Sequence, residues 1–162
     1  MNVIAWSPNL TAERADAAGM KAVSKEEFFR ESDIVSIHMF LAESTRGIVG
    51  KEELALMKRT ALLINTSRGP LVDEKALVEA LQAETIAGAG LDVYAIEPLP
   101  LGHPLRSVKN VTTTPHNAYV NDVTYRVRTV SLSIRPLTEC AITGLVGADH
   151  REHSKLSRRK AH

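Results

Sequence analysis

The residues best suited to chemistry in this sequence are an arginine, two carboxylates and a histidine that stand in or just after apolar segments. They are Arg68 after ALLINTS (61–67), Asp92 within IAGAGLDVY (86–94), Glu97 five residues later, and His116 after NVTTTP (110–115). Gathered in one place, these side chains would form a polar site of the kind that carries catalysis. Their spacing alone does not bring these four side chains together, so a polar site depends on the elements that hold them.

Apolar segments alternate with helical patterns along the chain. Nearly continuous apolar runs are typical of strands buried on both faces of a parallel sheet. We expect strands at 3–6, 33–41, 61–67, 86–94 and 110–115, and helices at 11–18, 24–30, 51–58 and 73–82. Ser24 with Glu27 forms a capping-box pattern, and Asp73 is a typical N-cap. The alternation predicts an α/β fold with a parallel sheet.

A parallel sheet of this kind binds ligands beyond the carboxyl ends of its strands. The residues that directly follow or end the expected strands are Ser7, Met39, Phe40, Arg68, Asp92 and His116. The small residues of IAGAGLDVY (86–94) also predict that another segment packs closely against this strand. His38 lies inside a strand pattern and is interpreted as a packed histidine.

The composition excludes several classes of protein. The chain has 162 residues, 44% of them hydrophobic, and a net charge of +1, which gives no general attraction to nucleic acid or membranes. No apolar run approaches the length of a membrane span, and no signal peptide is recognised. The single cysteine, Cys140, rules out an internal disulfide and a cysteine-based zinc site, and we expect a cytoplasmic protein.

The chain changes character after Pro115. Valines and isoleucine spaced three and four apart from Val120 to Ile134 predict an amphipathic helix, which Pro136 ends. We assign 126–149 to a divergent C-terminal helix and turn. The segment 150–162 is basic and is expected to be disordered, so its histidines are not expected to bind a metal.

Three stretches resemble the D-isomer-specific 2-hydroxyacid dehydrogenases, a family that includes phosphoglycerate dehydrogenase. They are LLINTSRGPLVDEKALVEAL (62–81), AGAGLDVYAIEPLP (87–100) and NVTTTPHNAYV (110–120), and SDIVSIHMFLAESTRGIVG (32–50) matches the same family. The resemblance covers about residues 1–125, which we assign to a partial NAD(P)-binding domain. It implies a Rossmann-like, doubly wound parallel sheet, and a reversible reduction of 2-keto acids with NAD, or with NADP as a second possibility.

The resemblance also implies roles for individual residues. Arg68 would hold the substrate carboxylate and carbonyl oxygen, and His116 would be the acid and base. Glu97 would hydrogen-bond the imidazole, fix its tautomer and keep it protonated near neutral pH. Asp92 would contact the nicotinamide end of the cofactor. The cofactor groove would be lined by Ser7, Met39, Phe40, Thr45, Thr66 and Ser67, together with Arg68, Asp92 and His116.

Each of the catalytic residues also has an ordinary structural interpretation. Arg68 could cap a neighbouring helix, Glu97 could be an unremarkable loop carboxylate, and His116 could be a loop histidine with a backbone partner.

The sequence departs from the family pattern in several places. It contains no G-x-G-x-x-G string, so we expect the sheet to lack the first, central strand and the glycine-rich turn that binds the pyrophosphate. The usual acidic residue at the ribose position is Ser7, Phe40 replaces a proline, and Ala118 replaces a glycine. The family's substrate domain and dimerisation elements are also not recognised. The isolated chain is therefore expected to be inactive on its small-acid substrate, and the alternatives are a non-catalytic nucleotide-binding remnant and an NAD-sensing corepressor-like protein.

Overall fold

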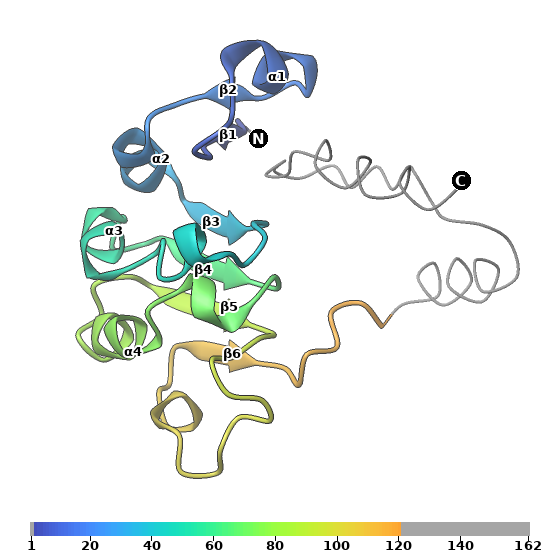
Figure 1. Ribbon diagram of the computed structural model, residues 1–162. Coiled ribbons are helices and arrows are strands. Elements are labelled where there is room, and N and C mark those ends of the chain that lie inside the picture. Colours follow the sequence, from blue (N-terminus) through green and yellow to red (C-terminus); the bar gives the residue numbers. More distant parts are fainter. Residues whose placement is uncertain (1, 121–162) are drawn as a thin grey trace, which may run out of the picture.

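The computed structural model describes residues 2–120, and Figure 1 shows the arrangement of their helices and strands. The elements are β1 (Ile4–Ala5), α1 (Ala12–Ala17), β2 (Lys21–Ala22), α2 (Lys25–Glu31), β3 (Ile34–Ile37), η1 (Glu43–Thr45), α3 (Lys51–Leu56), β4 (Leu62–Asn65), η2 (Gly69–Leu71), α4 (Glu74–Gln82), β5 (Gly88–Leu91), η3 (Pro104–Arg106) and β6 (Val111–Thr113). The helix expected over 120–134, the segment 126–149 and the tail 150–162 lie outside the described residues, apart from Val120.

Four strands form the main sheet, in the order β3-β4-β5-β6. All three neighbouring pairs are parallel, and the registers place Ile37 beside Asn65 and Asn65 beside Leu91. The four arrows point the same way in Figure 1, and α2, α3 and α4 lie along one side of them. The predicted parallel α/β architecture is therefore confirmed, and the carboxyl ends of the strands meet at a single edge.

A second, smaller sheet consists of β1 paired in parallel with β2. The sequence analysis did not identify β2, which is only two residues long. Within residues 2–120, β1 pairs only with β2, and β3 pairs only with β4, so the pairing is interrupted between β1 and β3. Ile34 of β3 is 58% exposed and Val3, next to β1, is 39% exposed. Exposed aliphatic side chains therefore lie on both sides of this interruption.

Three helices begin at the residues that the sequence indicated. The side chains of Thr11, Ser24 and Asp73 accept hydrogen bonds from amides of the first turns of α1, α2 and α4. These caps satisfy backbone donors that have no partner within a helix. Only half of the capping box at α2 is present, because the Glu27 carboxylate pairs with Lys21 at 3.1 Å.

Aliphatic side chains from the main sheet and from α3 and α4 form the core. The largest buried ones include Leu54, Leu63, Leu77, Leu81 and Ile86. They anchor the sheet against its helices through burial of apolar surface. None of the helices in the described part of the chain has the length and apolar character needed to cross a membrane.

Close packing around β5 confirms what its small residues predicted. A Cβ atom added to Gly88 would lie 2.7 Å from the carbonyl oxygen of Asn110, and one added to Gly90 would lie 3.1 Å from Cδ1 of Ile64. The first contact is with backbone at the start of β6 and cannot be relieved by turning a side chain. Gly88 therefore allows β6 to pair with β5.

We predict that Gly88→Ala lowers the free energy of unfolding by about 1–3 kcal/mol, because β6 must shift to accommodate the new methyl group. Urea denaturation of the full chain measures this effect. Gly102→Ala is the matched control, since a Cβ atom there meets nothing within 4 Å and should change stability by less than about 0.5 kcal/mol. Equal stability of the two variants would contradict the proposed packing role of Gly88.

Candidate active site

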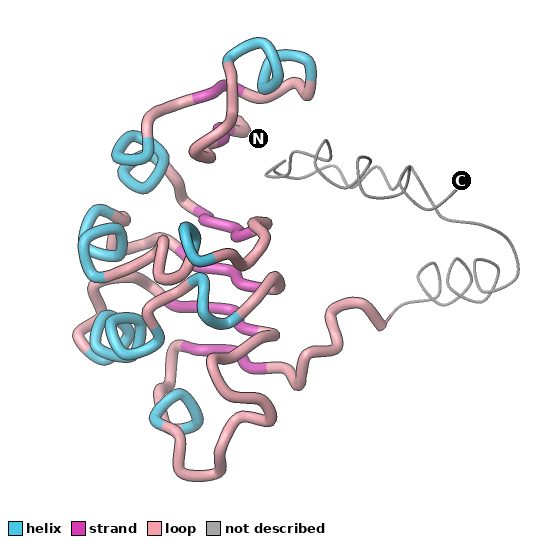
Figure 2. Tube along the Cα trace, in the orientation of Figure 1, coloured by secondary structure: helices cyan, strands magenta, loops and turns pink. Residues whose placement is uncertain are grey.

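The segments that follow β4, β5 and β6 leave the sheet at the same edge (Figure 2). The first of them carries Arg68, the second carries Glu97, and the third carries His116. Parallel strands thus bring together residues that are up to 48 positions apart in the chain (116 minus 68). The site predicted from strand ends has a structural basis.

His116 and Glu97 form a direct pair. Nδ1 of His116 lies 2.7 Å from Oε2 of Glu97, and each side chain keeps about a third of its surface exposed, at 37% and 35%. The other carboxylate oxygen of Glu97 accepts a hydrogen bond from the Tyr94 amide at 3.0 Å. Glu97 is therefore not an unpaired loop carboxylate, and His116 takes a side chain rather than a backbone group as its partner. The imidazole is oriented through Nδ1, which leaves Nε2 as the nitrogen for proton transfer.

The surroundings of Glu97 favour its charged form. Partial burial raises the pKa of this carboxyl group, but the hydrogen bonds from His116 and the Tyr94 amide and the positive charges of His116 and Arg68 lower it more. The net pKa of Glu97 lies below the ordinary glutamate value. At neutral pH the residue beside the imidazole is thus an anion, which is the state that stabilises an imidazolium.

Asp92 has a structural role that the sequence analysis did not identify. Its carboxylate is buried, and Oδ1 accepts hydrogen bonds from the Thr114 hydroxyl and from the Asn117 amide at 2.8 Å. Oδ2 accepts a hydrogen bond from the Ala118 amide at 2.8 Å. Burial raises the pKa of Asp92, yet these hydrogen bonds lower it to a net value below that of ordinary aspartate. Asp92 therefore shapes the turn that carries His116, and its expected contact with the nicotinamide remains a prediction.

Arg68 is exposed next to this arrangement. Its Nη1 donates a hydrogen bond to the Ser67 carbonyl at 2.6 Å, so its recorded bond goes to a neighbouring residue rather than to the end of another helix. The next residue, Gly69, packs against the second segment: a Cβ atom on Gly69 would lie 2.0 Å from the carbonyl carbon of Tyr94. This contact sets how close the arginine comes to the segment of Glu97.

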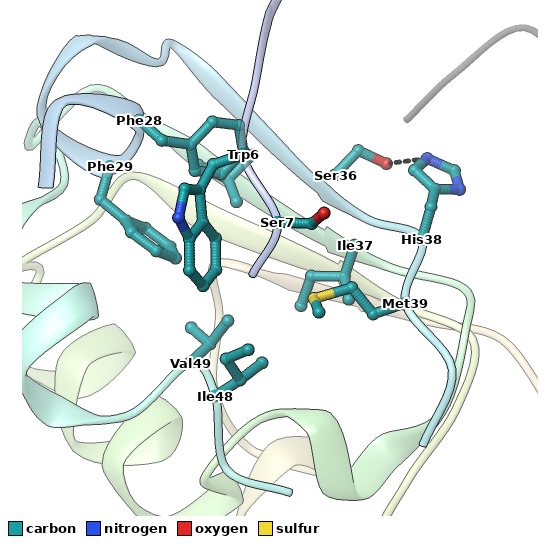
Figure 3. Close-up of a pocket in the computed structure, with 11 residues that line it drawn as sticks. Trp6, Ser7, Phe28, Phe29, Ser36, Ile37, His38, Met39, Ile48 and Val49 are labelled. Atoms are coloured by element: carbon teal, nitrogen blue, oxygen red, sulfur yellow. Dashed lines mark hydrogen bonds between the residues drawn. The ribbon is translucent and has the colours of Figure 1, made fainter. Parts of the chain in front are cut away.

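Ser7 and Met39, two of the expected cofactor residues, line one cavity between the ends of β1 and β3 (Figure 3). The remaining lining residues are Trp6, Phe28, Phe29, Val35, Ser36, Ile37, His38, Ile48 and Val49. The cavity holds about 40 Å³, whereas small-molecule sites usually measure about 300–1,000 Å³. The structure thus brings Ser7 and Met39 together, but this cavity alone does not enclose a nucleotide.

His38 was interpreted as a packed histidine, and the structure agrees with that. Its Nε2 lies 2.8 Å from the Ser36 hydroxyl, as the dashed line in Figure 3 shows. Partial burial lowers the pKa of His38, which keeps the ring neutral at pH 7. It also lines the cavity that contains Ser7 and Met39, a position that its place within an apolar strand did not reveal.

The other expected cofactor residues are not gathered in that cavity. Phe40 is 67% exposed, and Thr66 is exposed at the end of β4. Thr45 folds its own turn, since its hydroxyl donates to the Phe40 carbonyl and accepts from the Ala42 amide. Ser67 donates to the Ile37 carbonyl at 2.8 Å and so joins the loops after β3 and β4. Their contacts with a cofactor remain predictions.

A second cavity, of about 230 Å³, opens beside the acid–base pair. It is lined by Tyr94, Glu97, Pro98, Leu99, Arg106, Thr113, Thr114, Pro115 and His116. Residues 2–120 contain no cluster of histidine, cysteine and carboxylate side chains that could hold a metal ion. The side chains at this edge, an imidazole paired with a carboxylate and an exposed guanidinium, are of the types that can transfer a proton and bind an anion.

Comparisons with known proteins identify the family of this chain. The model of the D-isomer specific 2-hydroxyacid dehydrogenase NAD-binding domain matches residues 1–118. The glyoxylate reductase of Aeropyrum pernix is 48% identical over 118 residues, which are 73% of this chain and 35% of that protein. The D-3-phosphoglycerate dehydrogenase of Archaeoglobus fulgidus is 41% identical over 118 residues, 73% of this chain and 22% of that protein. This chain therefore spans about a third of the first relative and less of the second.

Solved structures of related oxidoreductases have a similar fold. The phosphoglycerate oxidoreductase of Vibrio cholerae superposes with a TM-score of 0.71 at 37% identity, covering 82% of this chain and 46% of that one. The D-lactate dehydrogenase of Lactobacillus jensenii with NAD⁺ gives a TM-score of 0.70 at 34% identity, covering 82% and 43%. The expected Rossmann-like fold is confirmed.

We predict that Glu97→Gln destabilises the chain at neutral pH and that the loss disappears in acid. A carboxyl group whose pKa is lowered by folding adds stability above its unfolded pKa of about 4.3, and this is lost as the pH falls through the folded pKa. Urea denaturation at pH 7 and near pH 3 tests this. Glu79→Gln, which removes an exposed carboxylate of α4, is the control and should show no such dependence. A constant Glu97→Gln effect across this range would mean that the charge of Glu97 does not stabilise the fold.

Proposed function

Because the chain belongs to the D-isomer specific 2-hydroxyacid dehydrogenase family, we propose that it forms the cofactor-binding half of an enzyme that interconverts 2-hydroxy and 2-keto acids with NAD. The observation that carries this proposal is the 2.7 Å contact between Nδ1 of His116 and Oε2 of Glu97, at the sheet edge shared with Arg68. An oriented imidazole beside an anion and a guanidinium is suited to reducing a carbonyl group next to a carboxylate.

In the proposed reaction, the nicotinamide supplies the hydride that reaches the carbonyl carbon. His116 donates the proton on Nε2 to the carbonyl oxygen, which leaves a neutral imidazole and a hydroxyl group. In the reverse direction the same nitrogen removes the hydroxyl proton. Glu97 stabilises the charged imidazolium through Nδ1. Arg68 binds the substrate carboxylate through paired hydrogen bonds and holds the carbonyl beside His116.

The carboxyl ends of strands in both sheets are followed by side chains that suit a dinucleotide. The hydroxyl groups of Ser7 and Thr66 follow β1 and β4, and neutral hydroxyls can hydrogen-bond ribose oxygens or phosphate. Asp92 accepts three hydrogen bonds from the His116 turn, so it would contribute to cofactor binding through the position of that turn as well as through its predicted contact with the nicotinamide. The relatives are named glyoxylate reductase and D-3-phosphoglycerate dehydrogenase, and the residues described here recognise only the 2-keto acid group that such substrates share.

The alternative is a chain that binds nucleotide without turnover. Calorimetry with NADH and NADPH, combined with assays of glyoxylate, hydroxypyruvate and pyruvate reduction, separates the two functions. Because the isolated chain is expected to be inactive, the assays decide when the chain is joined to the remaining parts of a relative. Turnover there that is lost in Arg68→Ala supports the enzyme, and nucleotide binding without turnover there supports the alternative.

The catalytic assignment can be tested in a chimera that joins residues 2–120 to the remaining parts of the Aeropyrum pernix glyoxylate reductase. We expect His116→Ala and Arg68→Ala each to lower kcat/KM by about 10²–10⁴-fold, because the first removes the acid and the second the carboxylate anchor. Glu97→Gln should lower kcat/KM less than His116→Ala, because the imidazole remains and only its Nδ1 partner changes. Lys109→Ala, an exposed change, is the control. A near wild-type rate for His116→Ala at neutral pH would refute the assignment.

Cofactor choice can be tested in the same chimera. Ser7 is neutral, so it can hydrogen-bond NADH or NADPH but repels neither, and we expect less than about tenfold discrimination, or about 1.4 kcal/mol. Ser7→Asp should shift the preference toward NADH through repulsion of the 2′-phosphate. Titration of both reduced cofactors measures the shift. Strong NADH selectivity that the substitution leaves unchanged would show that Ser7 does not occupy the ribose position.

A further inference from the structure

The segment that carries Glu97 is held by a second carboxylate, that of Glu74. Two consecutive amides of this segment donate to glutamates: Tyr94 donates to Glu97 itself, and Ala95 donates to Oε2 of Glu74 at 3.1 Å. Glu74 is the first residue of α4, so the second bond joins a helix start to a loop 21 positions further along the chain.

The other oxygen of Glu74 is held by a histidine. Oε1 lies 3.0 Å from Nε2 of His103, and both side chains are mostly buried, with 22% and 21% of their surface exposed. Nδ1 of His103 accepts a hydrogen bond from the Leu105 amide at 3.3 Å, so a neutral ring carries its proton on Nε2 and donates it to Glu74. Leu105 is 1% exposed and fixes this part of the chain in the core.

The Tyr94–Ala95 backbone also contacts the segment of Arg68. A Cβ atom on Gly69 would lie 2.6 Å from the Ala95 amide nitrogen, the same nitrogen that Glu74 accepts from. The peptide group between Tyr94 and Ala95 is thus in contact with the arginine turn and with Glu74, and the preceding peptide group, through the Tyr94 amide, donates to the Glu97 carboxylate. A displacement of the Tyr94–Ala95 backbone would therefore move both the arginine turn and the amide that holds Glu97.

From these contacts we infer that Glu74, oriented by His103, is a positioning residue that holds the 94–97 segment and thereby the Glu97–His116 pair. The meaning of this role for catalysis rests on the proposed function, but the contacts can be tested without substrate or cofactor. A simpler role for Glu74 is a favourable charge at the start of α4. That role predicts no change at Tyr94 or Glu97 when Glu74 is replaced.

The experiment compares the full chain with Glu74→Ala, Glu74→Gln and, as a charge-matched control on the exposed face of the same helix, Glu79→Ala. Nuclear magnetic resonance measures the hydrogen-exchange rate of the Tyr94 amide and the titration of the Glu97 carboxyl group. Tyr94 is informative because its acceptor, Glu97, is chemically unchanged in all of these variants.

For Glu74→Ala we expect Tyr94 exchange to rise about tenfold or more, since loss of the Ala95 acceptor loosens the segment. The titration midpoint of Glu97 should move up toward that of ordinary glutamate. Glu74→Gln keeps one acceptor oxygen and should fall between wild type and Glu74→Ala, whereas a pure charge effect would make the two variants equal. Glu79→Ala should match wild type.

The inference is overturned if Glu74→Ala changes only amides of α4, or if Glu74→Gln and Glu74→Ala give the same values at Tyr94 and Glu97. Should Glu74→Ala fail to fold, His103→Ala decides: faster Tyr94 exchange supports the positioning role, and wild-type exchange refutes it. Turnover of the chimera tests the proposed function separately, so either result can fail without the other.

Discussion

The buried carboxylate of Asp92 is the group on which the geometry of the acid–base pair depends. His116 has a φ of +55°, and this left-handed conformation costs a non-glycine residue about 1–2 kcal/mol. Three hydrogen bonds from the 114–118 turn to one ionised group oppose that cost, and each bond to a charged group contributes about 1.5–3 kcal/mol. The hydrogen bonds outweigh the strain, so the turn stays in the conformation that presents Nδ1 of His116 to Glu97.

Close backbone contacts at β5 and in the segment after it hold the other parts of the site in place. Gly88 lets β6 pair with β5, and Gly69 lets the turn after Arg68 lie against the Tyr94–Ala95 peptide group. Any larger residue would separate these segments, because the neighbouring atoms belong to the backbone and cannot rotate away. The three residues to which we assign catalytic roles therefore lie at one edge of the sheet although they belong to three separate loops, and these backbone contacts are what would give the loops the positional accuracy that catalysis needs.

The sequence predicted features whose causes are local. The helix starts at Thr11, Ser24 and Asp73 depend on a side chain and an amide two or three residues away, and the buried strands depend on apolar runs. The two-residue strand β2 was missed because Lys21 and Ala22 show no periodicity and pair only through the backbone of β1. The partners of Asp92 lie 22–26 positions further along the chain, and the Glu74–His103 contact joins the start of α4 to the residue before η3. Such contacts exist only after the sheet has formed, so no local pattern encodes them.

The described residues form the acid–base part of the proposed site more fully than its cofactor-binding part. The acid–base half is complete within residues 92–118, since the turn, the imidazole and its carboxylate partner are mutually hydrogen-bonded. On the cofactor side, Ser7 and Met39 line a cavity of only about 40 Å³ at the interruption between β1 and β3. General acid catalysis contributes about 10²–10⁴-fold, or about 3–5.5 kcal/mol, whereas holding two reactants in position contributes about 7–11 kcal/mol. In the proposed reaction the larger part of the rate enhancement would therefore come from holding cofactor and substrate in position, and the His116–Glu97 pair would determine what reaction that binding serves.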